Sequence, residues 1–485
     1  MIKLFFYVMT EVGHSNLDVK DISFINDIKT IAVIGPSKKR DYYFYKSHAE
    51  GFKGNVYAVH PTLKEIPGFS KDLIASTLKE IKEDIDYAWI TVPASQVLNV
   101  IYDCVEKGVK LVTIFSSDFS DSGTEEGLKL EQELLRRAQS KVRILGPNGM
   151  GLYYPKLGIA YRSQFPMTAG NIGLVAQSGG MCNISIYGAK AFGIKYSKAF
   201  SFGNGADLDP VDLIYFLSED PETDIILCYL EGIKNGRIDV LKKVLEQNKK
   251  PIICLKGGQS KSGSIAAKTH TASISGNDKL WKAFFRQYNL IEVDSLEQLL
   301  HTAHLIDCYG NFEINNLAVA SVSGGYGVVM IDLLEKYGFN LPQFSSDIQE
   351  KLNSKFILPG TSPKNPLDMA AHFFFESFIY DVLNLALSDK NIDGLIIDMP
   401  SFYLTPIFTR SRYSNSFESI VIESLSLGHK YNKPVIPIIQ RLNRPEDRER
   451  VAAKLAERKV PIFSDPLQVI PLLRKISEYN KRVKT

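Results

Sequence analysis

Short apolar segments alternate with longer amphipathic segments along most of this chain. In the first third, the segment Ala94–Lys107 has the spacing of an amphipathic helix, and the apolar segments around it are rich in β-branched and aromatic residues. These apolar segments are TIAVIG (30–35), NVYAVH (55–60), YAWITV (87–92), KLVTIF (110–115) and VRIL (142–145). Continuous apolar strands separated by helices predict a parallel sheet that is covered on both faces.

The pattern breaks at GPNG (146–149), and we place a domain boundary just beyond it. Two later segments, 171–194 and 316–339, then match in kind without a gap. Each has Asn, a mostly apolar strand, Ser-Gly-Gly and a helix that ends at glycine, with Ser178 and Ser323 separated by 323 − 178 = 145 positions. This predicts two related doubly wound domains in tandem, although a generic strand–turn–helix pattern would also produce such a match.

These breaks define the expected domain organisation. A helix over 295–308 would join the two related domains, and its Ser295/Gln298 spacing fits a capping box. The short apolar stretch at the N-terminus is read as an extension and not as a signal peptide, with Met9 as an alternative start. The expected parts are residues 1–24 (extension), 25–150, 151–312 and 313–485.

Composition excludes several classes of protein. Hydrophobic residues make up 45% and charged residues 23% of the 485 positions, which is globular composition. The net charge of +3 gives no argument for a nucleic-acid partner, and no apolar run reaches the ~20 residues that span a bilayer. The 5 cysteines are scattered without a CxxC motif, so we expect a cytoplasmic protein with no disulfide framework and no metal site.

The turn after the first strand, GPSKKR (35–40), is the first candidate site. A strand-to-helix turn at Gly35 directs backbone N–H groups and a helix dipole at a phosphate. The dinucleotide motif GxGxxG is absent, which disfavours an NAD dehydrogenase. The basic residues would suit the additional phosphates of coenzyme A, and a solvated basic turn would explain them as well.

The two Ser-Gly-Gly turns are the second candidate. Residues without bulky side chains let backbone amides approach an anion closely, and two helix N-termini directed at one point would bind a phosphoryl group strongly. Each turn on its own would also fit an ordinary tight connection. The residues concerned are Ser178, Gly179 and Gly180 in the first turn and Gly324 and Gly325 in the second.

A run of small residues over 257–276 is the third candidate, because a loop this long inside a compact domain is usually functional. It carries His270, whose imidazole would be a competent nucleophile toward phosphorus if a carboxylate oriented it. Glu231, at the end of an apolar strand, is the candidate carboxylate. An incidental loop histidine and a solvent-exposed glutamate remain open alternatives.

Taken together, these segments resemble the NDP-forming acyl-CoA synthetases, the superfamily of succinyl-CoA synthetase. The similarity spans roughly residues 25–480. It rests on KTHTASISGND (268–278), YLEGI (229–233), GPNGMG (146–151), FGNGADLDPVDLIYFLSEDPETDII (202–226) and NPLDM (365–369).

The resemblance implies an α/β fold in which an N-terminal Rossmann-like CoA-binding domain precedes two flavodoxin-like doubly wound domains. It also implies that His270 is phosphorylated, that Glu231 holds it, and that both Ser-Gly-Gly turns bind the phosphate. The residues implied in coenzyme A binding are Gly35, Ser37, Lys38, His60, Pro61, Val92, Pro93 and Asn148. The chain departs from the family at Thr62, where Lys is usual, and at Gly149, where Cys or a similar residue is usual.

No segment remains for an ATP-grasp domain, so the chain resembles the separate α subunit of the acetate–CoA ligase (ADP-forming) type. The resemblance implies an ATP-grasp β subunit as partner, which would bind ADP or ATP with Mg²⁺. The implied reaction is acyl-CoA + ADP + phosphate ⇌ carboxylic acid + ATP + CoA. A relative that transfers an acyl or carbamoyl group without phosphohistidine, and a non-enzymatic CoA-binding regulator, are the alternatives.

Overall fold

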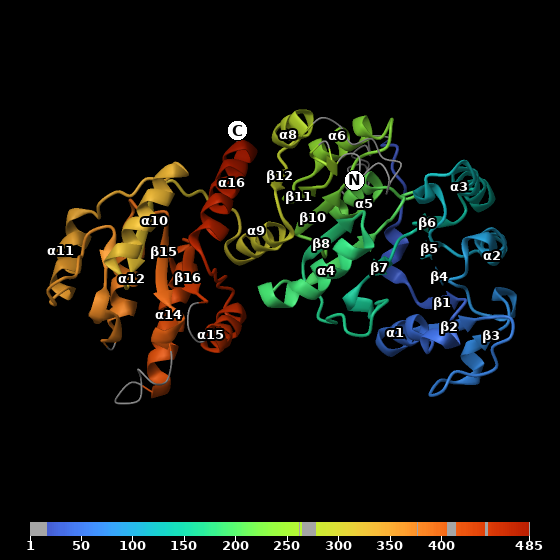
Figure 1. The fold of residues 1–485 in the computed structure, drawn as a ribbon, viewed down its shortest axis with the longest axis horizontal. Helices are drawn as coiled ribbons and strands as arrows, with labels where there is room; N and C mark the ends of the chain where they lie inside the picture. Colours follow the sequence, from blue (N-terminus) through green and yellow to red (C-terminus); the bar gives the residue numbers. More distant parts are fainter. Residues whose placement is uncertain are drawn as a thin grey trace, which may run out of the picture. The chain divides into compact units, whose positions relative to one another are not determined.

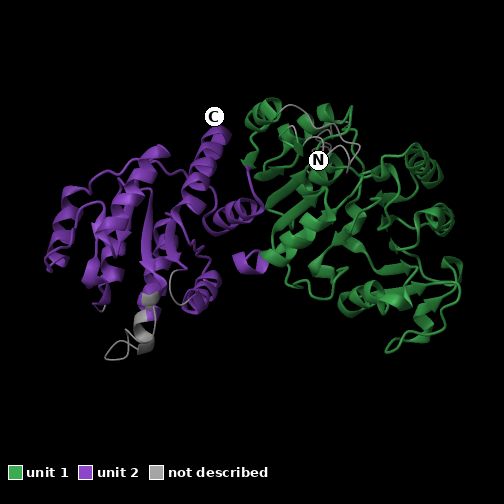
Figure 2. Ribbon diagram, viewed as in Figure 1, with its two compact units in different colours: residues 1–188, 195–292 green, residues 189–194, 293–485 purple. Residues whose placement is uncertain are grey.

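The computed structural model describes residues 17–260, 262–263, 278–375, 377–404, 414–441 and 445–484. The chain folds into two compact units (Figure 2). Unit 1 comprises residues 1–188 and 195–292, and unit 2 comprises residues 189–194 and 293–485. These units divide the chain differently from our expected domains, whose boundaries stay a prediction.

The first sheet of unit 1 is parallel, with the strand order β3-β2-β1-β4-β5-β6 (Figure 1). It contains all five strands expected from the apolar segments, and α2 has the expected bounds. The short edge strand β3 left no apolar pattern. The strands are β1 (Thr30–Ile34), β2 (Asn55–Val59), β3 (Ile74–Ala75), β4 (Tyr87–Ile90), β5 (Leu111–Ile114) and β6 (Arg143–Leu145). The helices are α1 (Tyr43–Gly51), α2 (Ala94–Lys107) and α3 (Glu125–Ala138).

The second sheet of unit 1 has the order β12-β11-β10-β8-β9-β7, in which β7 runs antiparallel to β9. Its strands β8, β9 and β11 are buried along their whole length, as expected where helices cover both faces. The strands are β7 (Gly151–Tyr153), β8 (Ile172–Ala176), β9 (Tyr196–Ser201), β10 (Ile225–Leu230), β11 (Ile252–Lys256) and β12 (Ile291–Val293). The helices are α4 (Gly179–Ala189), α5 (Pro210–Glu219), α6 (Ile238–Gln247) and α8 (Asp278–Gln287).

Unit 2 is built on a parallel sheet with the order β14-β13-β15-β16. Its strands are β13 (Leu317–Ser321), β14 (Leu367–Asp368), β15 (Gly394–Pro400) and β16 (Val435–Gln440). Its helices are α9 (Leu296–Tyr309), α10 (Gly324–Lys336), α11 (Ser346–Lys355), α12 (Phe378–Ser388), α14 (Ser414–Tyr431), α15 (Pro445–Glu457) and α16 (Pro466–Lys484). Within the described part of the chain, no helix combines the length and apolar character needed to cross a membrane.

Short 3-10 helices complete both units. They are η1 (Ser23–Asp27), η2 (Lys38–Arg40), η3 (Lys71–Leu73), η4 (Leu78–Glu80), η5 (Ser120–Ser122), η6 (Pro155–Leu157), η7 (Lys190–Phe192), η8 (Ala370–Phe374) and η9 (Ser401–Leu404).

The internal repeat is present in the structure with the spacing read from the sequence. Strands β8 and β13 begin 317 − 172 = 145 positions apart, and α4 and α10 begin 324 − 179 = 145 positions apart. In the sheets, Ala176 pairs with Tyr229 and Ser321 pairs with Asp398. The two strand–Ser-Gly-Gly–helix elements therefore occupy matching places, one in each unit.

Helix α9 begins as the sequence predicted but with only half of the capping box. Ser295 Oγ accepts a hydrogen bond from the Gln298 N–H at 3.1 Å. The Gln298 side chain accepts from the Asp294 N–H at 3.0 Å instead of from the Ser295 N–H. The helix therefore keeps its serine cap, while the glutamine binds the preceding residue.

The residues that precede the first sheet are tied to the second one. The Lys20 N–H donates to Asp212 Oδ1 at 3.0 Å, and its ammonium donates to the Asp207 carbonyl at 3.0 Å. Arg237 pairs with the same Asp212 carboxylate at 2.7 Å. Residue 20 thus belongs to the folded body of unit 1.

Candidate active site

The two sheets of unit 1 contribute to one cavity of about 1390 Å³. Residues at and beyond the carboxyl ends of β1, β4, β8 and β10 line it, which is where open α/β sheets bind their ligands. All eight residues expected to bind coenzyme A line this cavity: Gly35, Ser37, Lys38, His60, Pro61, Val92, Pro93 and Asn148. From the second sheet, Ser178, Gly179, Gly180 and Glu231 line it as well.

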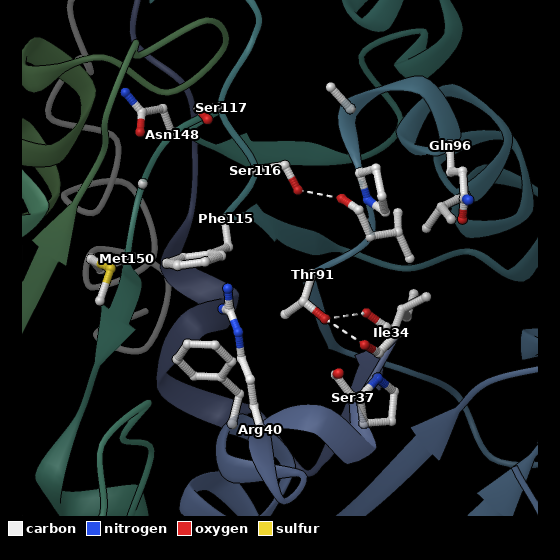
Figure 3. Close-up of a pocket in the computed structure, with 18 of the residues that line it drawn as sticks. Ile34, Ser37, Arg40, Thr91, Gln96, Phe115, Ser116, Ser117, Asn148 and Met150 are labelled. Atoms are coloured by element: carbon white, nitrogen blue, oxygen red, sulfur yellow. Dashed lines mark hydrogen bonds between the residues drawn. The ribbon is translucent and has the colours of Figure 1, made fainter.

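The turn after β1 requires a glycine. Gly35 has φ +84°, and a Cβ there would lie 2.7 Å from Val92 Cγ1. The Thr91 hydroxyl donates to the carbonyls of Ile34 at 3.0 Å and Gly35 at 2.8 Å (Figure 3). This fixed turn leads into η2, whose three basic residues are exposed at the cavity.

An aromatic wall lies beside this turn, and our sequence reasoning did not find it. The Phe44 ring packs against Trp89 at 4.5 Å and against Phe115 at 5.1 Å between centroids. Phe44 and Phe115 line the cavity. In Figure 3 the Arg40 side chain extends toward Phe115, so the wall faces a cation from η2.

The GPNG turn joins the two sheets closely. Asn148 has φ +57°, and its N–H donates to the Ser116 carbonyl at 2.9 Å. A Cβ at Gly203 would clash with the Pro147 carbonyl, and one at Gly149 would lie 2.8 Å from the Ser201 carbonyl. The departure at Gly149 therefore has a steric reason, because this backbone arrangement leaves no room for Cys.

The first Ser-Gly-Gly turn places the N-terminus of α4 at the cavity. A Cβ at Gly179 would lie 2.6 Å from Met150 Cγ, so a larger residue would move one of these elements. Ser178 Oγ accepts a hydrogen bond from the Met181 N–H at 3.3 Å. The partial positive charge of a helix N-terminus favours an anion at this point.

Glu231 follows β10 and is held by its backbone and its side chain. Its N–H donates to Gln177 Oε1 at 2.8 Å, and its carboxylate accepts from the Tyr229 hydroxyl at 3.2 Å. Burial first, and the Glu231 charge next, raise the pKa of Tyr229 to about 12. The tyrosine therefore stays a hydrogen-bond donor at neutral pH and orients the carboxylate.

Lys256, the last residue of β11, fixes the backbone around Glu231. Its side chain is buried and donates to the Glu231 carbonyl at 2.8 Å and to the Gly257 carbonyl. Desolvation lowers the pKa of this ammonium. A charged residue at the end of the buried strand PIICLK was the sequence signal that we missed.

The second Ser-Gly-Gly turn lies in unit 2, in acidic surroundings. A Cβ at Gly324 would clash with Asp368 Oδ2, whereas Gly325 faces open space. The buried Asp398 carboxyl accepts from Ser321 Oγ at 3.3 Å and from Gln440 Nε2 at 3.0 Å. Burial raises the pKa of Asp398 to about 6.

His270 and most of its loop lie outside the described residues. The predicted site residues of unit 1 apart from His270 thus line one cavity, and Gly324 and Gly325 belong to unit 2. The cavity also includes residues that sequence reasoning missed: Arg162, Gln177 and Asn183. Gln177 directly precedes the turn and so carried a signal, but Arg162 and Asn183 carried none.

Two family models match parts of the chain. The CoA binding domain model matches residues 29–155. The succinyl-CoA ligase like flavodoxin domain model matches residues 169–306. These matches support the expected order of a CoA-binding domain followed by a flavodoxin-like domain.

Known proteins resemble the chain over most of its length. It is 34% identical to the α subunit of acetate–CoA ligase [ADP-forming] II of Pyrococcus furiosus over 84% of this chain and 87% of the relative. It is 32% identical to acetate–CoA ligase [ADP-forming] I of Archaeoglobus fulgidus, matching 93% of this chain but 63% of that protein. The chain therefore spans less than two thirds of that second relative.

A solved structure shares the fold. It is acetyl-coenzyme A synthetase 1 of Ca. Korarchaeum cryptofilum, described as dinucleotide forming and bound to phosphate and ADP. The TM-score is 0.80 at 27% identity, and the match covers 95% of this chain and 97% of the other.

Proposed function

We propose that the unit 1 cavity performs the acyl-CoA half of the reaction of the ADP-forming acetate–CoA ligases, because this chain belongs to that family. One observation carries the proposal: the basic turn after β1, the N-terminus of α4 and Glu231 line the same cavity. The overall reaction is acyl-CoA + ADP + phosphate ⇌ carboxylic acid + ATP + CoA.

Coenzyme A would bind across the first sheet. The exposed cations of η2, Lys38 among them, match the negative charge of the CoA phosphates. The thin pantetheine arm would pass His60–Pro61 and Val92–Pro93. The thioester would then reach Asn148 and the start of α4, where an anion is favoured.

The first step is attack of inorganic phosphate on the thioester carbonyl. A phosphate oxygen forms a bond to the carbonyl carbon, the C–S bond breaks, and CoA leaves as the thiol after taking up a proton. The amide groups at the start of α4 would hold the phosphate during this step. The product is an acyl phosphate.

In the second step one ring nitrogen of His270 attacks the phosphorus and the P–O bond to the acyl group breaks, which releases the carboxylate. Glu231 accepts a hydrogen bond from the other ring nitrogen and stabilises the cationic ring. A Cβ at Gly257 would lie 2.9 Å from the Tyr229 hydroxyl, so the loop leaves β11 beside Glu231. Gly257, Gly258 and Gly263 would act as hinges that let His270 travel.

The phosphoryl group then passes to ADP on a partner. We assign that step to a separate ATP-grasp β subunit, which would bind ADP or ATP with Mg²⁺. One fact supports a partner chain: the relative from P. furiosus is named as an α subunit. The five cysteines are free and buried, which suits the cytoplasm as the compartment.

The test is phosphoenzyme formation by the purified chain. It is incubated with ³²P-labelled phosphate and a panel of acyl-CoAs, and the protein is examined for label that is acid-labile and base-stable. We expect label on the wild type and none on the His270→Asn variant, which should still bind coenzyme A.

Each outcome of the labelling experiment decides a specific point. Unchanged label on His270→Asn would exclude His270 as the acceptor. Absence of label with every acyl-CoA, from protein shown to bind coenzyme A, would favour a transferase or a CoA-binding regulator instead. Label that passes to added ADP without another chain would exclude the need for a β subunit.

A further inference from the structure

Arg162 is a cavity residue to which the proposed reaction gives no task. It lines the cavity together with the start of α4. Its Nε is enclosed and has no hydrogen-bond partner within the described part of the chain. An enclosed Nε–H group without an acceptor is costly, because the donor loses water and gains nothing in return. A group that supplies acceptors at this place would remove that cost.

The structure holds Arg162 in place through its neighbours. Tyr161 is fully buried and packs against the Phe165 ring with 5.1 Å between centroids. The Phe165 N–H donates to the Arg162 carbonyl at 3.2 Å, which closes a turn around the arginine. Because both flanking aromatic residues are buried, the backbone that presents Arg162 is pre-organised.

Asn183 presents a second donor to the same cavity. The Tyr161 hydroxyl donates to Asn183 Oδ1 at 2.9 Å, and burial keeps the pKa of this hydroxyl well above its usual value. With its oxygen engaged by Tyr161, the Asn183 amide offers its NH₂ group to a ligand. Asn183 lies one turn beyond Gly179 on α4, on the same helix face.

Cationic side chains lie on both sides of the cavity. Among the described lining residues, the cations Lys38, Lys39 and Arg40 come from the first sheet's side, whereas the second sheet's side contributes the cation Arg162 and the Glu231 carboxylate. The phosphates and the thioester lie at opposite ends of acyl-CoA. If the η2 cations meet the phosphates, Arg162 lies toward the acyl end.

We propose that Arg162 and Asn183 form a carboxylate-binding subsite for the far end of the acyl group, so that the preferred substrates are thioesters of dicarboxylic acids. This inference rests on the proposed function. A guanidinium fork binds a carboxylate through two parallel hydrogen bonds, and Asn183 supplies a further donor. Phosphate is the competing ligand for Arg162. However, the phosphoryl group must leave the cavity on His270 in each turnover, and a tight ion pair between Arg162 and that group would oppose its departure.

Length-matched thioesters test the inference. Glutaryl-CoA is compared with pentanoyl-CoA, and succinyl-CoA with butanoyl-CoA, using arsenate in place of phosphate and following the release of the CoA thiol. We expect the wild type to have a kcat/KM about 10- to 100-fold higher for the dicarboxylic member of each pair. Arg162→Met should abolish this preference and Asn183→Asp should reverse it, because its carboxylate repels that of the substrate.

A matched control is Arg136→Met, which removes an exposed arginine of α3 outside the cavity and should leave the preference unchanged. A wild type that prefers pentanoyl-CoA or treats both members equally would overturn the inference without any variant. An Arg162→Met variant that raises the KM for arsenate equally with all thioesters would show that Arg162 binds the inorganic anion, and would also overturn it. Thiol release from none of the thioesters would contradict the proposed function and this inference together.

Discussion

The two Ser-Gly-Gly turns have the same local sequence and the same place on their sheets, yet their surroundings differ in charge. In unit 1 the turn at Ser178 lines a cavity to which Arg162 contributes a cation and Glu231 a carboxylate. In unit 2 the turn at Ser323 lies beside two carboxyls, those of Asp368 and Asp398. A helix N-terminus is therefore not by itself an anion site, because its neighbours decide which ligand it accepts.

The register of the sheets shows where this difference arises. Tyr229 and Asp398 occupy equivalent positions, since each pairs with the last residue of the central strand that precedes a Ser-Gly-Gly turn. Tyr229 donates to Glu231, whereas Asp398 accepts from Ser321 and Gln440. One position thus orients the proposed catalytic carboxylate of Glu231 in unit 1 and buries a carboxyl in unit 2.

The largest contrast is expected between the two carboxyl groups in the labelling reaction. Glu231→Gln should lower the initial rate of phosphoenzyme formation by about 100- to 10,000-fold, the range for losing a group that supports acid–base or imidazolium chemistry. Asp398→Asn should leave this rate near that of the wild type. Equal losses in both variants, measured by rapid-quench ³²P labelling, would mean that the two turns are not distinct in function.

The next contrast concerns stability and pH. The folded-state pKa of Asp398, about 6, lies above its ordinary value of 3.8, so the carboxyl stabilises the fold while protonated and loses that contribution as pH rises from about 4 through 6. The loss is at most about 3 kcal/mol. Asp398→Asn should flatten the pH dependence of unfolding between pH 4 and 7, as measured by urea denaturation. If this variant and the wild type show the same pH dependence of unfolding, burial does not raise the pKa of Asp398.

A smaller effect is expected at the first glycine of the α4 turn. Gly179→Ala places a Cβ 2.6 Å from Met150 Cγ, and such overpacking costs about 1–3 kcal/mol. The displaced helix should also weaken phosphate binding, seen as a higher KM for phosphate in the thiol-release reaction. Wild-type stability together with a wild-type KM would show that Met150 moves aside freely.

The smallest effect is expected in unit 2 and has the opposite sign. Gly325→Ala meets no atom within 4 Å, and alanine favours helix over glycine by about 0.5–1 kcal/mol. The variant should therefore unfold at a slightly higher urea concentration than the wild type. A destabilised variant would indicate that something occupies the space beside Gly325 in solution.

Local sequence predicted the five longer strands of the first sheet well, because each is mostly apolar along its length. The bounds of α2 and the spacing of the two Ser-Gly-Gly elements were both readable in this way. The positions of Asp368 and Asp398 beside the second turn were not readable, since they depend on the pairing of β13 with both β14 and β15. Arg162 carried no periodic signal, because a turn held by Tyr161 and Phe165 presents it.

The close fit of the GPNG turn against residues 201–206 bears on how this chain can be recombined. The Asn204 N–H donates to the Pro147 carbonyl at 2.9 Å, and the Ala206 N–H donates to the Gly146 carbonyl at 3.0 Å. A chimera that exchanged residues 25–150 for those of a relative would separate the two halves of this contact. Donor segments should therefore be transplanted together with the 201–206 turn, so that both walls of the cavity come from one parent.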